Sequence, residues 1–427
     1  MKLSRFLKNR TVKNAGWIIG GQITNKLLAF LVGILTARYL GPGNYGLVNY
    51  AATYTTFFAS LCTLGINSVI IKNFVDHPGE EGQAIGTTLV LRAVSSFLSA
   101  LMIVGVASVL DRKEPLTILV VAVSSIGLLF QICDTFNQWF QYRLQSKYTA
   151  VATVVSYVAV SGYKLFLLMT GRSVVWFAMA TSVDYIVLGT MLMVAYRKTG
   201  GPALSVSGTK AKQLLSASVS FIMASLMASV YASTDKLMLK HLMNDAAVGY
   251  YGVAVSLSTT WAFLLQAVIT SVQPSIIQVY ESDRELFARR NRQLYALVFY
   301  GATGMSLVIC LLAKPIVGIL YGADYAGAIA PLQIVVWYTA FSYLGVARNA
   351  WMVCENRQKY LKYLYFCAAL INILLNALLI PNFGAAGAAA ASLLTQISTT
   401  FILPLLIRPL RNNARLMLEA VCLRGLF

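Results

Sequence analysis

Long apolar runs alternate with short polar segments along almost the whole chain. Each run is about as long as the ~20 mostly apolar residues that a membrane-spanning helix needs. The twelve runs cover approximately residues 14–36, 47–71, 84–110, 116–138, 149–169, 174–196, 214–238, 248–272, 293–320, 329–352, 361–380 and 387–407. Strands of a membrane barrel are about 10 residues long and alternate apolar with polar positions, which these runs do not. The pattern therefore predicts an all-α integral membrane protein with twelve transmembrane helices.

Local echoes divide the runs into two sets of six. Arg38-Tyr39-Leu40 after the first run resembles Lys240-His241-Leu242 after the seventh. Gln145-Ser146-Lys147-Tyr148 after the fourth run resembles Arg357-Gln358-Lys359-Tyr360 after the tenth. Such repeats are common in transporters, where the substrate site lies between the halves. We predict an N-terminal six-helix bundle at 1–200, a cytoplasmic linker at 201–213, a C-terminal six-helix bundle at 214–410 and a cytoplasmic C-terminal tail at 411–427.

Charged residues are few and mostly basic. They make up 11% of the chain, against about a quarter in soluble domains, and the net charge is +19. With a cytoplasmic N-terminus, the inner segments hold 23 Lys and Arg and the outer loops five. By the positive-inside rule we expect a multi-pass protein of a bacterial inner (plasma) membrane with both termini cytoplasmic. Because the charge is spread over short segments without an aromatic-basic platform, attraction to membrane lipids explains it better than nucleic-acid binding.

Polar residues recur at helical spacing inside several runs. The stripes run through the first, second and eighth runs, and include Gln22, Asn25, Lys26, Asn49, Thr53, Thr56 and Gln266. Close helix packing would explain Ser and Thr at such positions. Amides and a lysine fit packing less well, so we favour a hydrated cavity that these faces line.

Cations outnumber carboxylates within the runs. Lys26 is central in its run, where a lysine costs about 2.5–3.5 kcal/mol. The other cations in the runs include Arg92, Lys236 and Arg348, and the carboxylates are Asp134, Asp184 and Asp235. An excess of positive charge selects an anion, and phosphate or diphosphate suits lysine and arginine. Ion pairing of Lys26 with Asp184, and snorkelling of the cations nearer the interfaces, are the alternative interpretations.

Motifs of soluble enzymes and metal sites are missing from the sequence. It contains no phosphate-binding loop, nucleophile elbow or zinc-protease motif. Six cysteines lack metal-type spacing, and there are only two histidines. We therefore expect a transporter without a metal site, and not an enzyme.

Four segments carry a resemblance to a known family. They are Asn14-Ala15-Gly16-Trp17 with Ala37-Arg38-Tyr39-Leu40-Gly41-Pro42-Gly43-Asn44-Tyr45-Gly46; Ser233-Thr234-Asp235-Lys236-Leu237-Met238-Leu239 with Val248-Gly249-Tyr250-Tyr251; Gln273-Pro274-Ser275; and Pro381-Asn382-Phe383-Gly384-Ala385-Ala386-Gly387-Ala388-Ala389. With the twelve-run layout, they resemble the Wzx-type polysaccharide flippases of the multidrug/oligosaccharidyl-lipid/polysaccharide exporter superfamily.

The resemblance implies a fold and a function. It implies two six-helix bundles around a central, cationic cavity, and movement by alternating access. The cargo would be an undecaprenyl-diphosphate-linked oligosaccharide repeat unit, carried from the cytoplasmic to the periplasmic leaflet for surface polysaccharide such as O-antigen. Arg38, Asp235 and Lys236 match family segments by position. A proton or Na⁺ gradient would drive the cycle, with Asp184, Asp134 and Asp235 as candidate coupling carboxylates and no other cofactor. A polysaccharide polymerase and a chain-length regulator are the expected protein partners.

Three other functions remain open at this point. A cation-coupled multidrug exporter of the same superfamily would prefer carboxylates and aromatic rings, which the cationic excess disfavours. A membrane glycan ligase or polymerase would carry catalytic groups in a large outer loop, and the predicted outer loops are short. A structural scaffold for glycan assembly would leave the polar stripes unexplained.

Overall fold

The computed structural model describes the backbone of residues 10–425, and the side chains of residues 25–425 except 27, 68, 220 and 224. The chain forms two compact units. The N-terminal unit holds Met1–Leu40 and Leu47–Ser229, and the C-terminal unit holds Gly41–Gly46 and Val230–Phe427.

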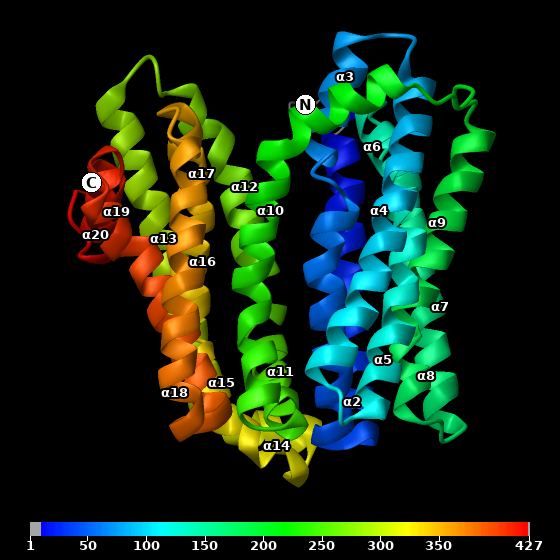
Figure 1. Ribbon diagram of the computed structural model, residues 1–427. Coiled ribbons are helices and arrows are strands. Elements are labelled where there is room, and N and C mark those ends of the chain that lie inside the picture. The colour runs from blue at the N-terminus through cyan, green and yellow to red at the C-terminus, as the bar shows by residue number, and fades with distance from the viewer. Residues whose placement is uncertain (1–9, 426–427) are drawn as a thin grey trace. The chain divides into compact units, whose positions relative to one another are not determined.

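Helices make up the regular structure of the N-terminal unit (Figure 1). In chain order they are α2 (Arg10–Cys62), α3 (Asn67–Asp76), α4 (Glu81–Leu110), α5 (Pro115–Ser125), η1 (Ile126–Cys133), α6 (Asp134–Tyr142), α7 (Lys147–Met169), α8 (Val174–Ala178), α9 (Ala180–Lys198) and the first part of α10 (Gly208–Leu242).

The C-terminal unit is built in the same way and takes in the second part of α10. It continues with α11 (Asp245–Thr260), α12 (Phe263–Gln278), α13 (Arg284–Leu311), α14 (Ala313–Tyr321), η2 (Ala323–Ala328), α15 (Ile329–Val335), α16 (Tyr338–Ala347), α17 (Asn349–Cys354), η3 (Gln358–Tyr360), α18 (Leu361–Ile397), η4 (Ser398–Ile402), α19 (Leu403–Leu406), η5 (Arg408–Leu410) and α20 (Arg411–Val421).

The predicted helical membrane fold is confirmed, and each of the twelve apolar runs lies in helical structure. Among the described residues, seven helices are long and apolar enough to cross a membrane, or nine if two bent pairs are single spans. Two helices account for part of the difference from twelve, and each continues across a break. The helix α2, which is not among the seven, contains the first run and residues 47–62 of the second, and α18 contains the eleventh run and residues 387–397 of the twelfth. The breaks fall at Gly41 (φ 68°) and Gly384 (φ 54°), in a backbone region that glycine adopts readily.

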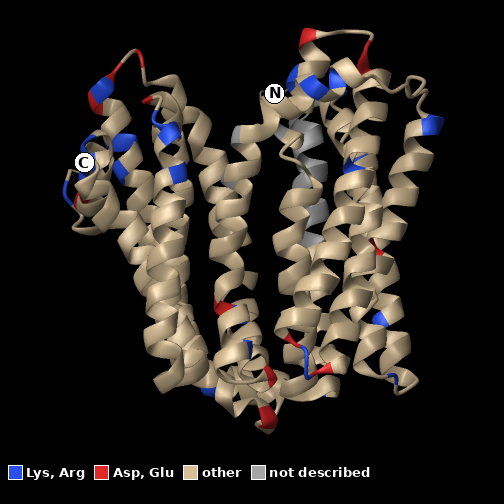
Figure 2. Ribbon diagram, viewed as in Figure 1, with Lys and Arg blue, Asp and Glu red and all other residues tan. Residues whose placement is uncertain are grey.

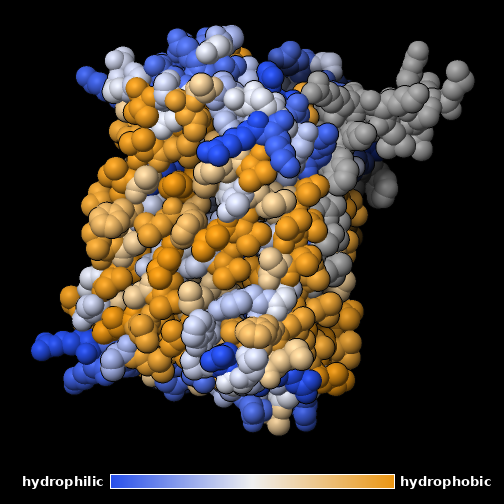
Figure 3. Space-filling view, turned by 90° about the vertical axis from the view of Figure 1, so that its right-hand side faces the viewer, coloured by the Kyte–Doolittle hydropathy of each residue, from blue (hydrophilic) through white to orange (hydrophobic). Residues whose placement is uncertain are grey.

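Apolar side chains cover the outside of the helices as well as their core. Aromatic and branched side chains fill a core in each unit, around Phe136 and Trp139 in the N-terminal unit and around Tyr295 and Trp351 in the C-terminal unit. Yet Leu101 is 56% exposed. One face shows an apolar band with hydrophilic residues at both ends (Figure 3). This distribution is what lipid requires, since apolar side chains facing a bilayer need no burial in protein.

Lysine and arginine gather at one end of each unit (Figure 2). In the N-terminal unit this end carries α3, and in the C-terminal unit it carries the start of α13 and the tail helix α20. These are the ends at which the sequence places its inner segments.

One turn is built twice, once in each unit. Leu144 and Asn356 both adopt a left-handed backbone, with φ of 52° and 54°. The amide of the next residue closes the turn in both cases, because Gln145 N donates to Phe140 O at 2.8 Å and Arg357 N donates to Met352 O at 2.8 Å. The two turns precede the echoed segments 145–148 and 357–360, so the sequence echo corresponds to a shared backbone structure.

The same pairing extends to side chains after the turns. The ammonium group of Lys147 lies 4.8 Å from the ring centroid of Tyr148, and that of Lys359 lies 5.5 Å from that of Tyr360. These contacts give further support to the internal repeat.

The segment 201–207 packs closely on the first turns of α4. A Cβ atom at Gly82 would lie 2.2 Å from the carbonyl oxygen of Ala203, and one at Gly86 would lie 2.3 Å from that of Ser205. Two glycines four residues apart therefore form a groove for the segment, because residues at this spacing share one helix face.

Polar contacts hold the C-terminal end of this packed region. Ser207 N donates to Thr87 Oγ1 at 3.1 Å. Lys210 Nζ donates to Glu80 Oε2 at 2.6 Å, and the Lys210 side chain is only 5% exposed. The Lys210 ammonium group holds the pKa of the Glu80 carboxyl below its usual range. The segment is thus held against α4 from Ala203 to Ser207.

Glycines also allow close packing where α2 turns. Within the C-terminal unit, Gly46 lies against the start of α11. A Cβ at Gly46 would lie 1.8 Å from the carbonyl oxygen of Asp245, and one at Gly249 would lie 2.1 Å from that of Pro42. Any side chain at either position would meet backbone atoms, which cannot rotate away.

Candidate functional site

Among the described side chains, Arg92 is the most deeply buried cation of the N-terminal unit. It lies on α4, is 1% exposed, and donates from Nη1 to Thr135 Oγ1 at 3.0 Å and from Nη2 to Asn67 Oδ1. Its Nε has no partner, and among the described side chains no carboxylate forms an ion pair with it. Asp134, next to Thr135 in the chain, accepts a hydrogen bond from Asn137 at 3.2 Å. The structure thus places Arg92 and Asp134 in the same region of the unit.

The predicted stripe in the first run is only partly described. Gln22 lies outside the described side chains. Asn25 is 6% exposed, and its Oδ1 is buried without a partner. Lys26 and Arg38 are exposed. Lys26 forms no ion pair with Asp184 among the described side chains.

In the second run, the stripe makes mostly local contacts. Asn49 is half-buried. Thr53, which is buried, donates to Asn49 O at 2.9 Å, and the exposed Thr56 donates to Ala52 O at 2.8 Å. Both hydroxyl groups therefore bond to their own helix, as threonine does in apolar surroundings.

Asp184 of α9 is half-buried and faces α7. Ser156 donates from Oγ to its backbone oxygen at 2.8 Å and also to its carboxylate. A serine hydroxyl stabilises the charged form of the carboxyl but does not neutralise it. Asp184 is therefore compatible with a role in ion coupling, although the sequence did not predict its partner.

Asp235 of α10 is the centre of a polar cluster in the C-terminal unit. It is 7% exposed and accepts hydrogen bonds from Tyr251 at 2.6 Å, Asn376 at 2.7 Å and Ser392 at 2.5 Å. Asn376 also donates to Asn372 Oδ1 at 3.0 Å. All three partners of the carboxyl group are uncharged, and no described cation forms an ion pair with it.

Two other predicted residues of this unit lie elsewhere. Lys236 follows Asp235 on α10 and is half-buried. Gln266 is exposed on α12 and donates to Thr270 Oγ1 at 3.2 Å, one helical turn away.

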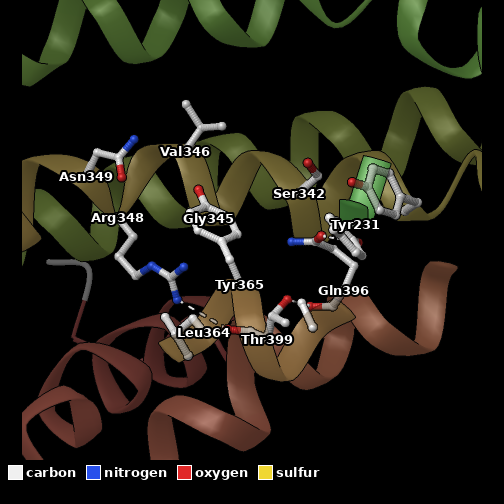
Figure 4. Close-up of a pocket in the computed structure, with 12 residues that line it drawn as sticks. Tyr231, Ser342, Gly345, Val346, Arg348, Asn349, Leu364, Tyr365, Gln396 and Thr399 are labelled. Atoms are coloured by element: carbon white, nitrogen blue, oxygen red, sulfur yellow. Dashed lines mark hydrogen bonds between the residues drawn. The ribbon is translucent and has the colours of Figure 1, made fainter. Parts of the chain in front are cut away.

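Arg348 lines a cavity inside the C-terminal unit (Figure 4). The cavity has a volume of about 160 Å³. Its walls come from α10, α16, α17, α18 and η4, and the lining residues are Tyr231, Tyr338, Ser342, Gly345, Val346, Arg348, Asn349, Leu364, Tyr365, Ala368, Gln396 and Thr399. None of these is acidic, so Arg348 supplies the only formal charge in the lining.

The guanidinium group of Arg348 is buried but sparsely bonded. The residue is 7% exposed, and Nη1 donates to the carbonyl oxygen of Thr399 at 3.3 Å. Its Nε is buried without a partner, and no described carboxylate forms an ion pair with it. At the other end of the cavity, Tyr231 donates to Gln396 Oε1 at 3.1 Å. The cavity therefore offers a positive group and neutral hydrogen-bonding groups to an occupant.

Solved structures with the same fold include a lipid flippase and multidrug transporters. The lipid II flippase MurJ in an inward closed conformation is 14% identical, with a TM-score of 0.74 over 94% of this chain and 90% of that chain. An inward-facing multidrug resistance MATE family transporter of the MOP superfamily is 14% identical, with a TM-score of 0.68 over 94% and 98%. A MOP superfamily transporter from Pyrococcus furiosus is 11% identical, with a TM-score of 0.55 over 96% and 94%. At these identities the likeness establishes the fold alone.

The sequence itself defines the family. The family described as polysaccharide biosynthesis protein matches residues 11–280, well over half of the chain. This protein belongs to that family, which confirms the resemblance noted in its sequence. No curated protein sequence matches the chain.

Proposed function

We propose that the protein is a flippase for a lipid-linked glycan. Its cargo would be an undecaprenyl-diphosphate-linked oligosaccharide repeat unit, moved by alternating access from the cytoplasmic to the periplasmic leaflet for surface polysaccharide, including O-antigen. Membership of the polysaccharide biosynthesis family and the transporter fold support this proposal. The observation that carries it is Arg348, a buried guanidinium in a polar cavity with no acidic lining residue.

The charge of this cavity favours an anionic cargo over a cationic drug. A diphosphate does not cross hydrocarbon unaided, because an unpaired ion there is costly. A guanidinium group matches phosphate oxygens in geometry and charge. A cationic drug would instead be repelled by Arg348 and would find no carboxylate in the lining. The cavity therefore disfavours the multidrug exporter as a function for this chain.

Asp235 is the best candidate for coupling to a proton or Na⁺. It is 7% exposed, whereas Asp134 and Asp184 are half-buried. Its oxygens accept hydrogen bonds from neutral groups only, so no described side chain with a positive charge competes with a coupling cation for the carboxylate. A coupling ion there would lie in the same unit as the Arg348 cavity.

Membrane placement and partners form part of the proposal. The basic ends of the units support an inner-membrane protein with both termini in the cytoplasm, by the positive-inside rule. A polysaccharide polymerase and a chain-length regulator would then act on the product at the outer leaflet.

Leaflet-resolved labelling of the cargo tests the function. In cells that lack the protein, the lipid-linked unit should accumulate in the inner leaflet, out of reach of a membrane-impermeant glycan-modifying reagent. The wild-type gene should restore access, and Arg348→Gln should not. Arg408→Gln, at an exposed position, is the matched control and should restore access fully. If the cargo reaches the outer leaflet at the normal rate without the protein, the proposed function is wrong.

A further inference from the structure

Arg348 lies close to the basic end of the C-terminal unit. It precedes the end of α17 at Cys354 by six residues, which is about 9 Å along a helix. Basic residues at Arg357, Lys359 and Lys362 follow directly. A group at this depth is near the headgroup region of a bilayer rather than its centre.

The cavity opens at this level rather than being sealed. Two of its lining residues are exposed: Asn349, and Tyr365 with 40% of its surface accessible. The Tyr365 side chain lies beside the Arg348 guanidinium group (Figure 4). An anionic group could therefore approach Arg348 from outside the unit past the Tyr365 ring.

Gly345 leaves the space in front of the guanidinium group empty. A Cβ atom at this position would lie 3.7 Å from Gln396 Nε2 and 3.9 Å from Arg348 Nη2. The glycine therefore faces two nitrogen donors that a larger side chain would cover. The cavity volume of about 160 Å³ is similar to that of an engineered cavity of about 150 Å³ that binds benzene. The space suits one small group.

The Arg348 guanidinium group also has hydrogen-bond donors without an acceptor in the structure. A guanidinium group carries five N–H donors, and the structure gives Arg348 one hydrogen-bond acceptor, the carbonyl oxygen of Thr399. The buried Nε has none. An unpaired buried donor is costly, and an oxyanion with several acceptors would satisfy it.

We propose that the Arg348 cavity binds the phosphate group of a lipid headgroup, taken from the leaflet at the basic end of the unit. Arg348 supplies the charge, Gln396 Nε2 supplies a neutral donor, and Gly345 provides the room. This inference rests on the proposed function if the lipid is the cargo, for which the cavity is then an entry subsite. Phosphate on a bulk anionic phospholipid has the same chemistry and is the other source.

Inorganic pyrophosphate tests the phosphate site without any transport. The full-length protein in neutral detergent is heated at increasing pyrophosphate concentration, with sodium chloride at matched ionic strength as the reference. Wild-type protein should show a saturable rise in melting temperature. In Arg348→Gln the concentration for half the effect should rise about tenfold or more, since losing one charge-assisted contact has an effect of that order. Arg348→Lys keeps the charge but loses the planar guanidinium group, so its pyrophosphate concentration for half the effect should lie between those of the wild type and Arg348→Gln.

Filling the cavity gives a second variant that keeps the arginine. Gly345→Leu should weaken pyrophosphate binding as much as Arg348→Gln, because the side chain would occupy the space beside Arg348 Nη2. Gly304→Leu is the matched control, since a Cβ at Gly304 meets nothing within 4 Å, and it should bind as the wild type does. No saturable shift in the wild type, or an unchanged shift in Gly345→Leu or Arg348→Gln, would overturn the proposal.

Lipid retention then separates the two sources. Protein in nanodiscs is offered undecaprenyl diphosphate, undecaprenol or phosphatidylglycerol, and the lipid retained after extraction is measured by mass spectrometry. Retention of undecaprenyl diphosphate that depends on Arg348 supports an entry subsite for the cargo. If only the retention of phosphatidylglycerol depends on Arg348, the result supports the phosphate site and assigns it to bulk lipid. If Arg348→Gln retains both phosphate lipids as the wild type does, or undecaprenol is held equally well, the proposal fails.

The binding result and the transport result are independent. A protein that binds pyrophosphate through Arg348 but moves no glycan in the labelling assay would refute the proposed function alone. A protein that moves glycan normally but shows no Arg348-dependent phosphate binding would refute this inference alone.

Discussion

Replacing Gly249 by alanine should destabilise the C-terminal unit through a clash between backbones. The added Cβ would lie 2.1 Å from the carbonyl oxygen of Pro42, whereas ordinary contacts lie at 3.4–4 Å. The two segments must therefore separate by about 1.3 Å, the difference between 3.4 and 2.1 Å. Overpacking of this kind costs about 1–3 kcal/mol. Alanine gains about 1 kcal/mol over glycine as a helix former, which leaves a net loss of up to about 2 kcal/mol.

A matched glycine isolates the steric part of this effect. Gly304→Ala has the same gain in helix propensity, but its Cβ meets nothing within 4 Å. Thermal inactivation of the purified full-length protein, followed by loss of the monodisperse peak in size-exclusion chromatography, gives the comparison. Gly249→Ala should inactivate at a lower temperature than the wild type, and Gly304→Ala at the same or a higher one. Equal stability of the two variants would show that the close approach at Gly249 is not a real constraint.

Three other predictions concern the repeated turn, the packed linker and the buried carboxylate. Leu144→Gly should stabilise the protein by about 1 kcal/mol, because a left-handed backbone costs about that much for leucine. Asn356→Gly should raise the melting temperature less, since asparagine tolerates this backbone region, and equal rises for the two variants would contradict this reasoning. Lowering the pH should expose segment 201–207 to protease, because the ion pair of Glu80 with Lys210 stabilises the fold above the unfolded pKa of Glu80, about 4.3, and this stability is lost as the pH falls through the lower folded pKa. Glu80→Gln or Lys210→Met should remove this pH dependence of proteolysis. Asp235→Asn keeps a side chain of the same shape without the charge, so glycan movement should stop responding to an imposed proton or Na⁺ gradient, and an unchanged response would exclude Asp235 from coupling.

Hydrophobic runs predicted the helices well because lipid imposes a simple rule. Every backbone polar group in the hydrocarbon must be bonded within the protein, so a long apolar run has to be a helix. The rule says less about where helices end. The breaks at Gly41 and Gly384 occur inside α2 and α18, and α2 holds the first run together with residues 47–62 of the second. The glycines were visible in the sequence, but nothing local showed that the chain would reverse there without a loop.

The polar residues were harder to place because their partners are distant in sequence. Asp235 was a candidate from its position in a run, yet its partners Asn376 and Ser392 are 141 and 157 residues away. Thr53 and Thr56 looked like a cavity lining, but their hydroxyl groups bond to the carbonyl oxygens of their own helix. Helical spacing shows which residues share a face and gives no information on what that face meets.

Arg348 shows the same limit for a site. The excess of intramembrane cations predicted an anion-binding protein, and Arg348 was among the residues named. Gly345 and Gln396 complete the cavity, but neither carries a charge that draws attention in a sequence. A pair of arginine and glycine three residues apart at the inner end of a run is the one local signal that could have indicated a space beside the guanidinium group.

Because segment 201–207 packs on α4, the chain has no free linker between α9 and α10 in this stretch. The segment packs on α4 from Ala203 and is hydrogen-bonded to it at Ser205 and Ser207, and α10 begins at Gly208 immediately afterwards. The border between the two units falls inside α10, after Ser229. Segment 201–207 therefore does not act as a flexible tether, and the chain passes from one unit to the next within a helix. An epitope or a protease site inserted at 203–206 should for that reason be tolerated far less well than the length and polarity of this stretch would lead an engineer to assume.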